Sequence, residues 1–170
     1  MTIAMAPDLH HRIAGSLYGL LVGDALGCAV EGWPPEKIRA TYGMLQTMEE
    51  ARERWRPAGL HSDDGQQALA LCDALLHDPW RPAARFAQLL IDLYQAAPKR
   101  RNSFGLHRGT GRDCRQAIKF LLADCEPHAA GQPADGNGVA MMIAPLTGCL
   151  GPHGRRWGVA RRIVARQCQA

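Results

Sequence analysis

The opening segment of the chain carries apolar residues at the spacing of an amphipathic helix. They stand three or four positions apart: Leu9, Ile13, Leu17, Leu20 and Leu21. Residues at this spacing share one face of a helix. We therefore expect a first helix over residues 9–27, ended by the Gly-Trp-Pro-Pro stretch at residues 32–35. A short helix over residues 36–41 is expected next, followed by a loop over residues 43–61.

The same spacing predicts three more long helices. One begins after Ser62 and ends near His77, because Asp-Pro follows at residues 78–79. The other two lie around residues 86–93 and 114–122.

Shorter helical patterns complete the chain. Asn137 is expected to cap a short helix that Pro145 ends, and a weaker helix is expected around residues 157–164. The sequence contains no alternating strand pattern of useful length and no internal repeat. We therefore predict an all-α, orthogonal multi-helix bundle.

Length and composition favour one domain spanning residues 1–170. A chain of 170 residues that is 46% apolar can bury a core of its own. Its six cysteines match no zinc-binding spacing, so they are expected to be reduced thiols in a cytoplasmic protein. The apolar run after Arg12 loosely resembles a signal peptide, but Asp24 interrupts it, and we interpret it as a core helix. We expect no membrane-spanning segment and no membrane partner.

Two arginine-rich stretches suggest a nucleic-acid-binding alternative. They lie at residues 99–112 and 155–166, in a chain whose formal net charge is +4. Aromatic residues that could stack on bases do not alternate with these arginines, except at Trp157. A solvated basic surface is the favoured interpretation, and a nucleic-acid partner is not expected.

The strongest chemical signal is Ser62-Asp63-Asp64, a hydroxyl and two carboxylates at the start of an apolar helix. Hard cations such as Mg²⁺ prefer oxygen ligands of this kind. Ser62 could equally cap the helix, with both aspartates stabilising its first turn. Taken alone, the capping interpretation is the better one.

Two further carboxylates precede this motif. Asp24 lies on or near the apolar stripe of the first helix, where a buried charge is costly unless it is paired. We expect it to be tied to the end of a neighbouring helix. Glu31 follows where that helix gives way, and taken alone it is typical of a solvated helix end.

Three sequence blocks together resemble the ADP-ribosylglycohydrolase family. The first is GLLVGDALG at residues 19–27, followed by Glu31, where the family has roughly G-x-x-x-G-D-A-x-G and a downstream Glu. The second is GLHSDDGQQAL at residues 59–69, where the family has T-D-D-T. The third is DGNGVAMMIAPL at residues 135–146, where the family has G-N-G-x-x-M-R-x-x-P. The resemblance covers about residues 12–165 and corresponds to the N-terminal half to two-thirds of the family.

This resemblance implies a metal-dependent hydrolase that cleaves the glycosidic bond between ADP-ribose and a protein side chain or another conjugate. It implies two divalent ions, Mg²⁺ or Mn²⁺, with the first metal ligands at Ser62, Asp63 and Asp64. Glu31 stands at the position of the family's acidic residue beside the scissile bond. The positions that correspond to ADP-ribose contacts are Gly109, Gly111, Asn137 and Gly138.

The sequence departs from the family pattern in three respects. Gly65 replaces the last Thr of T-D-D-T, Met142 replaces the motif's Arg, and the family's C-terminal D-x-D-T-like ligand cluster has no counterpart. Three alternatives follow. The chain is a truncated hydrolase, a catalytically inactive relative that acts as an ADP-ribose-binding or interaction module, or a chain that assembles with a second polypeptide or with itself. Truncation also predicts exposed apolar surface, through which the chain could self-associate.

Overall fold

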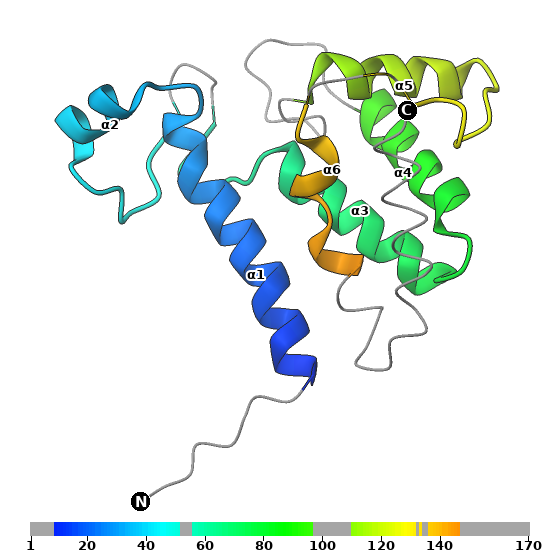
Figure 1. The fold of residues 1–170 in the computed structure, drawn as a ribbon, viewed down its shortest axis with the longest axis horizontal. Coiled ribbons are helices and arrows are strands. Elements are labelled where there is room, and N and C mark those ends of the chain that lie inside the picture. The colour runs from blue at the N-terminus through cyan, green and yellow to red at the C-terminus, as the bar shows by residue number, and fades with distance from the viewer. Residues whose placement is uncertain (1–8, 52–55, 97–109, 132, 134–135, 147–170) are drawn as a thin grey trace, which may run out of the picture.

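The computed structural model describes residues 9–51, 56–96, 110–131, 133 and 136–146. This part of the chain is helical, with one isolated antiparallel bridge between Ala51 and Arg56 and no strand beyond it (Figure 1). The elements in order are α1 (Leu9–Gly27), the 3₁₀ helix η1 (Cys28–Val30), α2 (Pro35–Tyr42), α3 (Asp63–His77), α4 (Pro82–Ala96), α5 (Arg112–Leu122) and α6 (Gly138–Met141).

The helices expected from apolar spacing are confirmed, and so is the all-α fold class. The first helix has the expected bounds, and α3 ends at His77 as predicted. Two details are wrong: the Asn137 side chain makes no capping hydrogen bond at the start of α6, and α6 ends at Met141, before Pro145. The helix expected at residues 157–164 lies outside the described residues.

The core is built around α3, which packs against α1, α4 and α6. Three residues of α3 form its centre, together with two that follow α6: Ala68, Leu71, Leu75, Met142 and Leu146. Leu20 of α1 and Phe86 of α4 pack against this cluster. Met142, at the position of the family's motif Arg, is thus a buried core residue. At this position the side chain packs against the apolar residues of α3, an environment that suits methionine better than a charged arginine.

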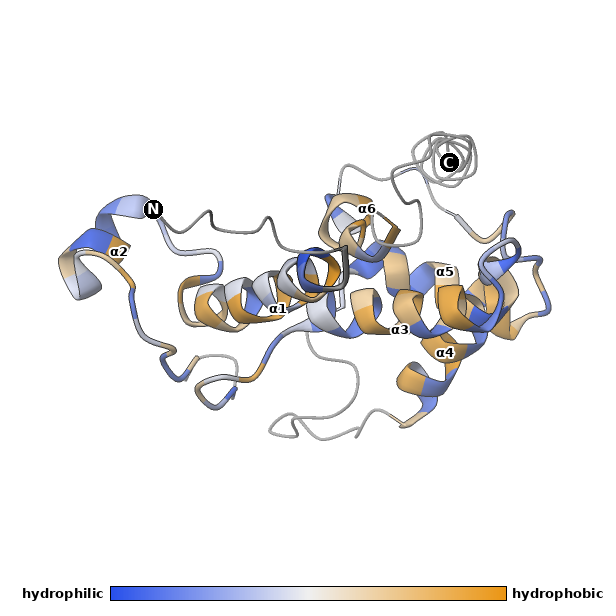
Figure 2. Ribbon diagram, turned by 90° about the horizontal axis from the view of Figure 1, so that it is seen from below, coloured by the Kyte–Doolittle hydropathy of each residue, from blue (hydrophilic) through white to orange (hydrophobic). Residues whose placement is uncertain are grey.

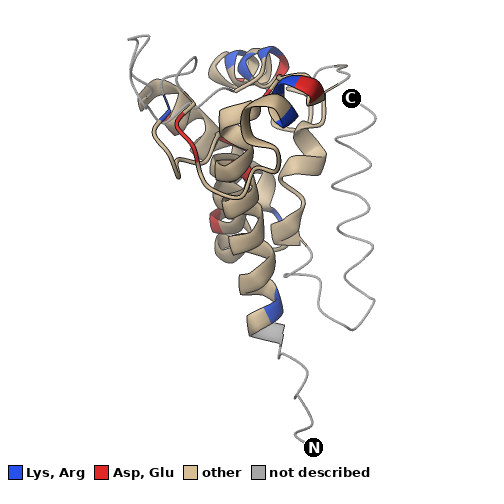
Figure 3. Ribbon diagram, turned by 90° about the vertical axis from the view of Figure 1, so that its left-hand side faces the viewer, with Lys and Arg blue, Asp and Glu red and all other residues tan. Residues whose placement is uncertain are grey.

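The first helix lies beside α3 with much of its own surface exposed (Figures 1 and 2). Tyr18 is 70% exposed and Val22 is 51% exposed. Between Arg12 and Asp24, α1 carries no charged residue (Figure 3). The expectation of a fully packed core helix is therefore wrong for this face of α1.

The expectation that no segment has the length and composition of a membrane span is also wrong. Residues His11–Val30 are long and apolar enough to cross a membrane by those two criteria. A signal sequence near an N-terminus or a core helix meets the same criteria, so this finding alone assigns no membrane role.

The burial of Met142 generates a stability prediction. Met142→Arg restores the family's motif residue but places a charge in the hydrophobic cluster of Ala68, Leu71 and Leu75. We expect a loss of about 3 kcal/mol in the free energy of unfolding, since an uncompensated buried charge is costly. Urea denaturation followed by circular dichroism measures this loss.

The neighbouring Ile143→Arg is the matched control, because Ile143 is 36% exposed. We expect its stability to stay close to that of the parent protein. Equal stability of the two variants would contradict the placement of Met142 in the core.

Candidate functional site

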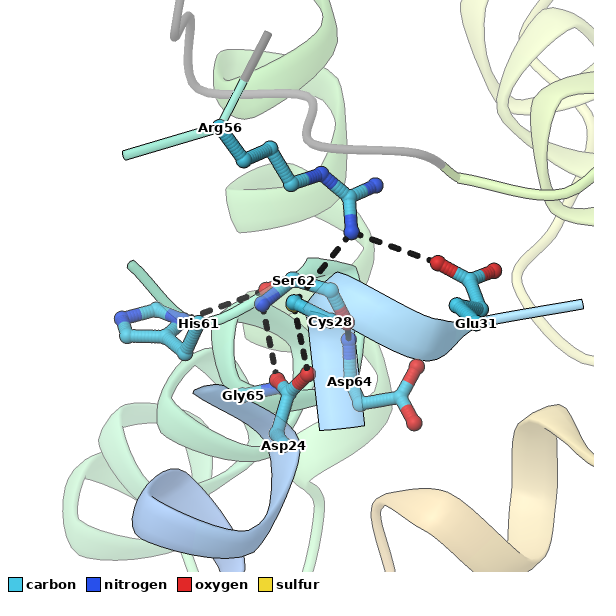
Figure 4. A network of polar contacts seen from close by, with 8 residues as sticks. All are labelled: Asp24, Cys28, Glu31, Arg56, His61, Ser62, Asp64 and Gly65. Carbon is cyan, nitrogen blue, oxygen red and sulfur yellow. Dashed lines mark hydrogen bonds and ion pairs between the residues drawn. The ribbon is translucent and has the colours of Figure 1, made fainter. Parts of the chain in front are cut away.

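The site begins with the carboxylate of Asp24, which caps a helix other than its own. Its Oδ2 atom accepts hydrogen bonds from the backbone amides of Ser62 and Gly65, both at 2.9 Å (Figure 4). The first amides of a helix have no partner within that helix. Asp24, near the end of α1, supplies partners at the start of α3. The expectation that Asp24 is tied to a neighbouring helix end is confirmed.

Ser62 caps α3 through its own side chain. Its backbone is extended, and its Oγ atom accepts a hydrogen bond of 3.2 Å from the Asp64 amide. The capping interpretation of Ser62 is therefore confirmed. It does not compete with a role in metal binding, because a hydroxyl oxygen has a second lone pair.

Asp63 and Asp64 occupy the first turn of α3, where their carboxylates are close enough to repel each other. Burial, and after it the charge of Asp64, raises the pKa of Asp63 to about 6. Burial also raises the pKa of Asp64, with a second contribution from the charge of Asp24. The Gln67 side chain donates to Asp63 Oδ2 at 3.1 Å. This cluster is one that an added cation would stabilise.

The charge of Glu31 contributes to the raised pKa of both Asp63 and Asp64. Glu31 therefore lies within electrostatic reach of these two aspartates. Its side chain is half-exposed, and its Oε2 atom lies 3.3 Å from Nη1 of Arg56. Glu31 is therefore an ion-paired residue, whereas the sequence alone favoured a solvated helix end.

Arg56 is the residue that the sequence analysis missed. It is only 6% exposed although it belongs to the loop expected over residues 43–61. Its Nη1 atom also donates to Cys28 Sγ at 3.4 Å, and the Cys28 thiol donates to Asp24 Oδ1 at 3.6 Å. Burial raises the pKa of Cys28, which keeps this thiol protonated and able to donate. A continuous polar network thus joins Asp24 to Glu31 (Figure 4).

The donor atoms suit a hard divalent cation. Within the described residues, no three Asp, Glu, His or Cys side chains are arranged as a complete metal cage. Mg²⁺ does not require one, since it is commonly held by one or two carboxylates and retains several waters. Asp63, Asp64 and the Ser62 hydroxyl meet that description in kind and number.

The remaining predicted site residues are placed only in part. Gly111 precedes α5, whose Cys114 has its pKa raised to about 11 by burial and by the charge of Asp63. The start of α5 therefore lies near the acidic cluster. Asn137 and Gly138 lie at the start of α6, which packs on α3. Gly109 lies outside the described residues.

Gly65 is a position of close approach. A Cβ atom added there would lie 2.7 Å from His61 Nδ1 and 2.8 Å from Leu21 Cδ2. The His61 ring and the α1 side chain thus occupy the space that the family's Thr side chain would need. The departure at this position is explained by packing between α1 and α3.

The chain belongs to the ADP-ribosylglycohydrolase family, whose model matches residues 5–169. It is 28% identical over 140 residues to the ADP-ribosyl-[dinitrogen reductase] glycohydrolase of Rhodospirillum rubrum. This match covers 82% of this chain and 45% of that protein. It is 29% identical over 138 residues to an uncharacterised protein of Archaeoglobus fulgidus, covering 81% of this chain and 43% of the relative.

A solved structure shows the same fold. This is an ADP-ribosylglycohydrolase-related protein complex, with a TM-score of 0.71 and 29% sequence identity over 94% of this chain and 50% of that one. The chain thus spans about half the length of the relatives that it matches.

The tight contact at Gly65 predicts that a single methyl group there destabilises the protein. We expect Gly65→Ala to lower the free energy of unfolding by about 1–3 kcal/mol, because His61 and Leu21 must move aside. Gly19→Ala is the matched control, since a Cβ at Gly19 meets nothing within 4 Å and alanine favours a helix. Thermal melts of both variants test this, and a Gly65→Ala melt at or above the parent temperature would refute it.

The raised pKa of Asp63 predicts a pH-dependent stability in metal-free buffer. The folded protein holds the proton with a pKa of about 6, against an ordinary value of 3.8. The stabilisation is therefore fully present below the ordinary value and is lost as the pH rises through about 6. Asp63→Asn has no such titration. We expect the melting temperature of this variant, relative to the parent, to increase between about pH 4 and pH 6 and then level off. A constant difference in EDTA buffer would contradict the shift.

Proposed function

We propose that the chain functions as a metal-dependent hydrolase of ADP-ribose conjugates, cleaving the bond between the ribose anomeric carbon and a protein side chain or another leaving group. Family membership supports the class of substrate. The observation that carries the proposal is the grouping of Glu31, Asp63 and Asp64 at the start of α3, within electrostatic reach of one another.

Asp63, Asp64 and the Ser62 hydroxyl are the proposed ligands of Mg²⁺ or Mn²⁺, with two ions in the complete site. A bound divalent ion at such a site supplies charge stabilisation and lowers the pKa of a coordinated water. The raised pKa of Asp63 supports this assignment, because a cation favours the ionised form that burial and Asp64 disfavour.

Glu31 is the proposed catalytic carboxylate. When the leaving group departs with the electrons of the scissile bond, positive charge develops on the ribose ring. A carboxylate beside the ring stabilises that charge, or accepts a proton as the oxygen of water bonds to the anomeric carbon. The proton taken from that water passes to the leaving group, directly or through solvent, as the scissile bond breaks. A half-exposed side chain such as that of Glu31 is accessible to both substrate and water.

The ADP-ribose contacts are proposed at Gly109, Gly111, Asn137 and Gly138, on the strength of the family motifs. The position of Gly111 at the start of α5, near Asp63, supports its part of this proposal. Helix starts and glycine loops present amides that suit a diphosphate. Self-association through exposed apolar surface and a cytoplasmic location stay predictions.

The decisive experiment measures release of ADP-ribose from a mono-ADP-ribosylated protein, with Mg²⁺, with Mn²⁺ and with EDTA. We expect metal-dependent release that falls by about 10²–10⁴-fold in Glu31→Gln, and that is lost in Asp63→Asn. The control is Asp73→Asn, which alters an exposed aspartate paired with Arg85 on the outer surface.

The outcomes separate the alternatives. Release that depends on metal and on Glu31 supports the hydrolase. A metal-dependent thermal shift with ADP-ribose but no release would point to the binding module instead. The absence of both ADP-ribose release and a thermal shift would contradict both roles for this 170-residue chain.

A further inference from the structure

Arg56 is a buried cation that the proposed chemistry does not use. It lies beside the carboxylate assigned to catalysis, and its charge acts on both Asp63 and Asp64. A buried guanidinium is costly to desolvate unless it is paired. Its placement here therefore calls for a role beyond loop packing.

The backbone around Arg56 is fixed before its side chain reaches the site. The Ala51 amide donates to the Arg56 carbonyl at 2.9 Å, and the Arg56 amide donates to the Ala51 carbonyl at 3.2 Å. Both residues of this bridge are buried. These two hydrogen bonds fix the position of the Arg56 backbone from which the side chain extends toward the site.

The Arg56 side chain then joins two points of the chain that follows α1. Nη1 donates to Cys28 Sγ at 3.4 Å in η1 and to Glu31 Oε2 at 3.3 Å (Figure 4). Cys28 is buried, so the contact to it anchors the guanidinium, whereas Glu31 is half-exposed and free of secondary structure. The guanidinium is thus a fixed positive charge beside a carboxylate that is itself half-exposed to solvent.

We propose that Arg56 is a positioning residue that holds the Glu31 carboxylate at the acidic end of α3. The effect on turnover rests on the proposed function, in which Glu31 is catalytic. Without the guanidinium, the half-exposed Glu31 side chain loses its 3.3 Å ion pair and can turn its carboxylate toward solvent. A displacement of about 1 Å can cost a catalytic group about 100-fold in rate.

The test is a double-mutant cycle on the 170-residue chain. The variants are Arg56→Gln, Glu31→Gln and the two combined, with Arg56→Lys as the conservative replacement. Arg85→Gln is the control, because it breaks the exposed 2.8 Å ion pair with Asp73. For each protein, the melting temperature is measured in EDTA, and kcat and KM are measured for ADP-ribose release.

We expect Arg56→Gln to lower kcat by about 10–100-fold with little change in KM, since the lost geometry matters in the transition state. The combined variant should be no slower than Glu31→Gln alone, because the two residues act as a unit. Arg56→Lys, which keeps the charge, should recover part of kcat. Arg85→Gln should match the parent protein.

Three results overturn the proposal: parental kcat in Arg56→Gln, multiplicative losses in the combined variant, or an Arg56→Lys protein that folds like the parent yet recovers no activity. If the parent protein itself releases no ADP-ribose, the proposed function fails and the melting temperatures decide. Melting-temperature shifts of the Arg56 and Glu31 variants that do not add up in the combined variant then support the interaction between the two side chains, and additive shifts overturn it.

Discussion

The structure depends on one carboxylate shared between two helices. Asp24 belongs to α1 but satisfies amides at Ser62 and Gly65, at the start of α3. A carboxylate placed among apolar residues is tolerable only when it is hydrogen-bonded, and helix-start amides are strong partners for it. This bond fixes where α1 ends relative to α3. It thereby places Glu31, seven residues later in the chain, beside the aspartates of the first turn.

The same arrangement gathers like charges, and the chain compensates only in part. The charges of Asp64 and Glu31 act on Asp63, those of Asp24 and Glu31 act on Asp64, and the positive charge of Arg56 acts on both aspartates. Asp24 accepts hydrogen bonds from two backbone amides and from the Cys28 thiol, and Glu31 forms an ion pair with Arg56. Burial and the charge of Asp64 raise the pKa of Asp63 to about 6, so the protein disfavours the ionised form of this carboxyl. A divalent ion supplies the kind of charge that this position lacks.

The sequence predicts the helices and part of the site, for identifiable reasons. Apolar spacing is a local signal, so α1, α3, α4 and α5 follow from it. Asp24 is predictable because a carboxylate on an apolar stripe needs a partner. The burial of Arg56 is not predictable, because it depends on an irregular backbone bridge to Ala51 within the loop and on a contact with Cys28, 28 residues earlier in the chain.

The two motif departures show a different limit of sequence reasoning. Gly65 and Met142 look like lost polar groups when they are compared with the family pattern. In three dimensions Gly65 lets α1 and His61 approach α3, and Met142 fills the core beneath that helix. Each substitution is matched by its packing neighbours, and neither removes Asp63, Asp64 or Glu31 from the acidic cluster. The departures from the family motif therefore lie at positions where helices pack against each other. The carboxylates of Asp63 and Asp64, on which the proposed chemistry depends, keep their places at the start of α3.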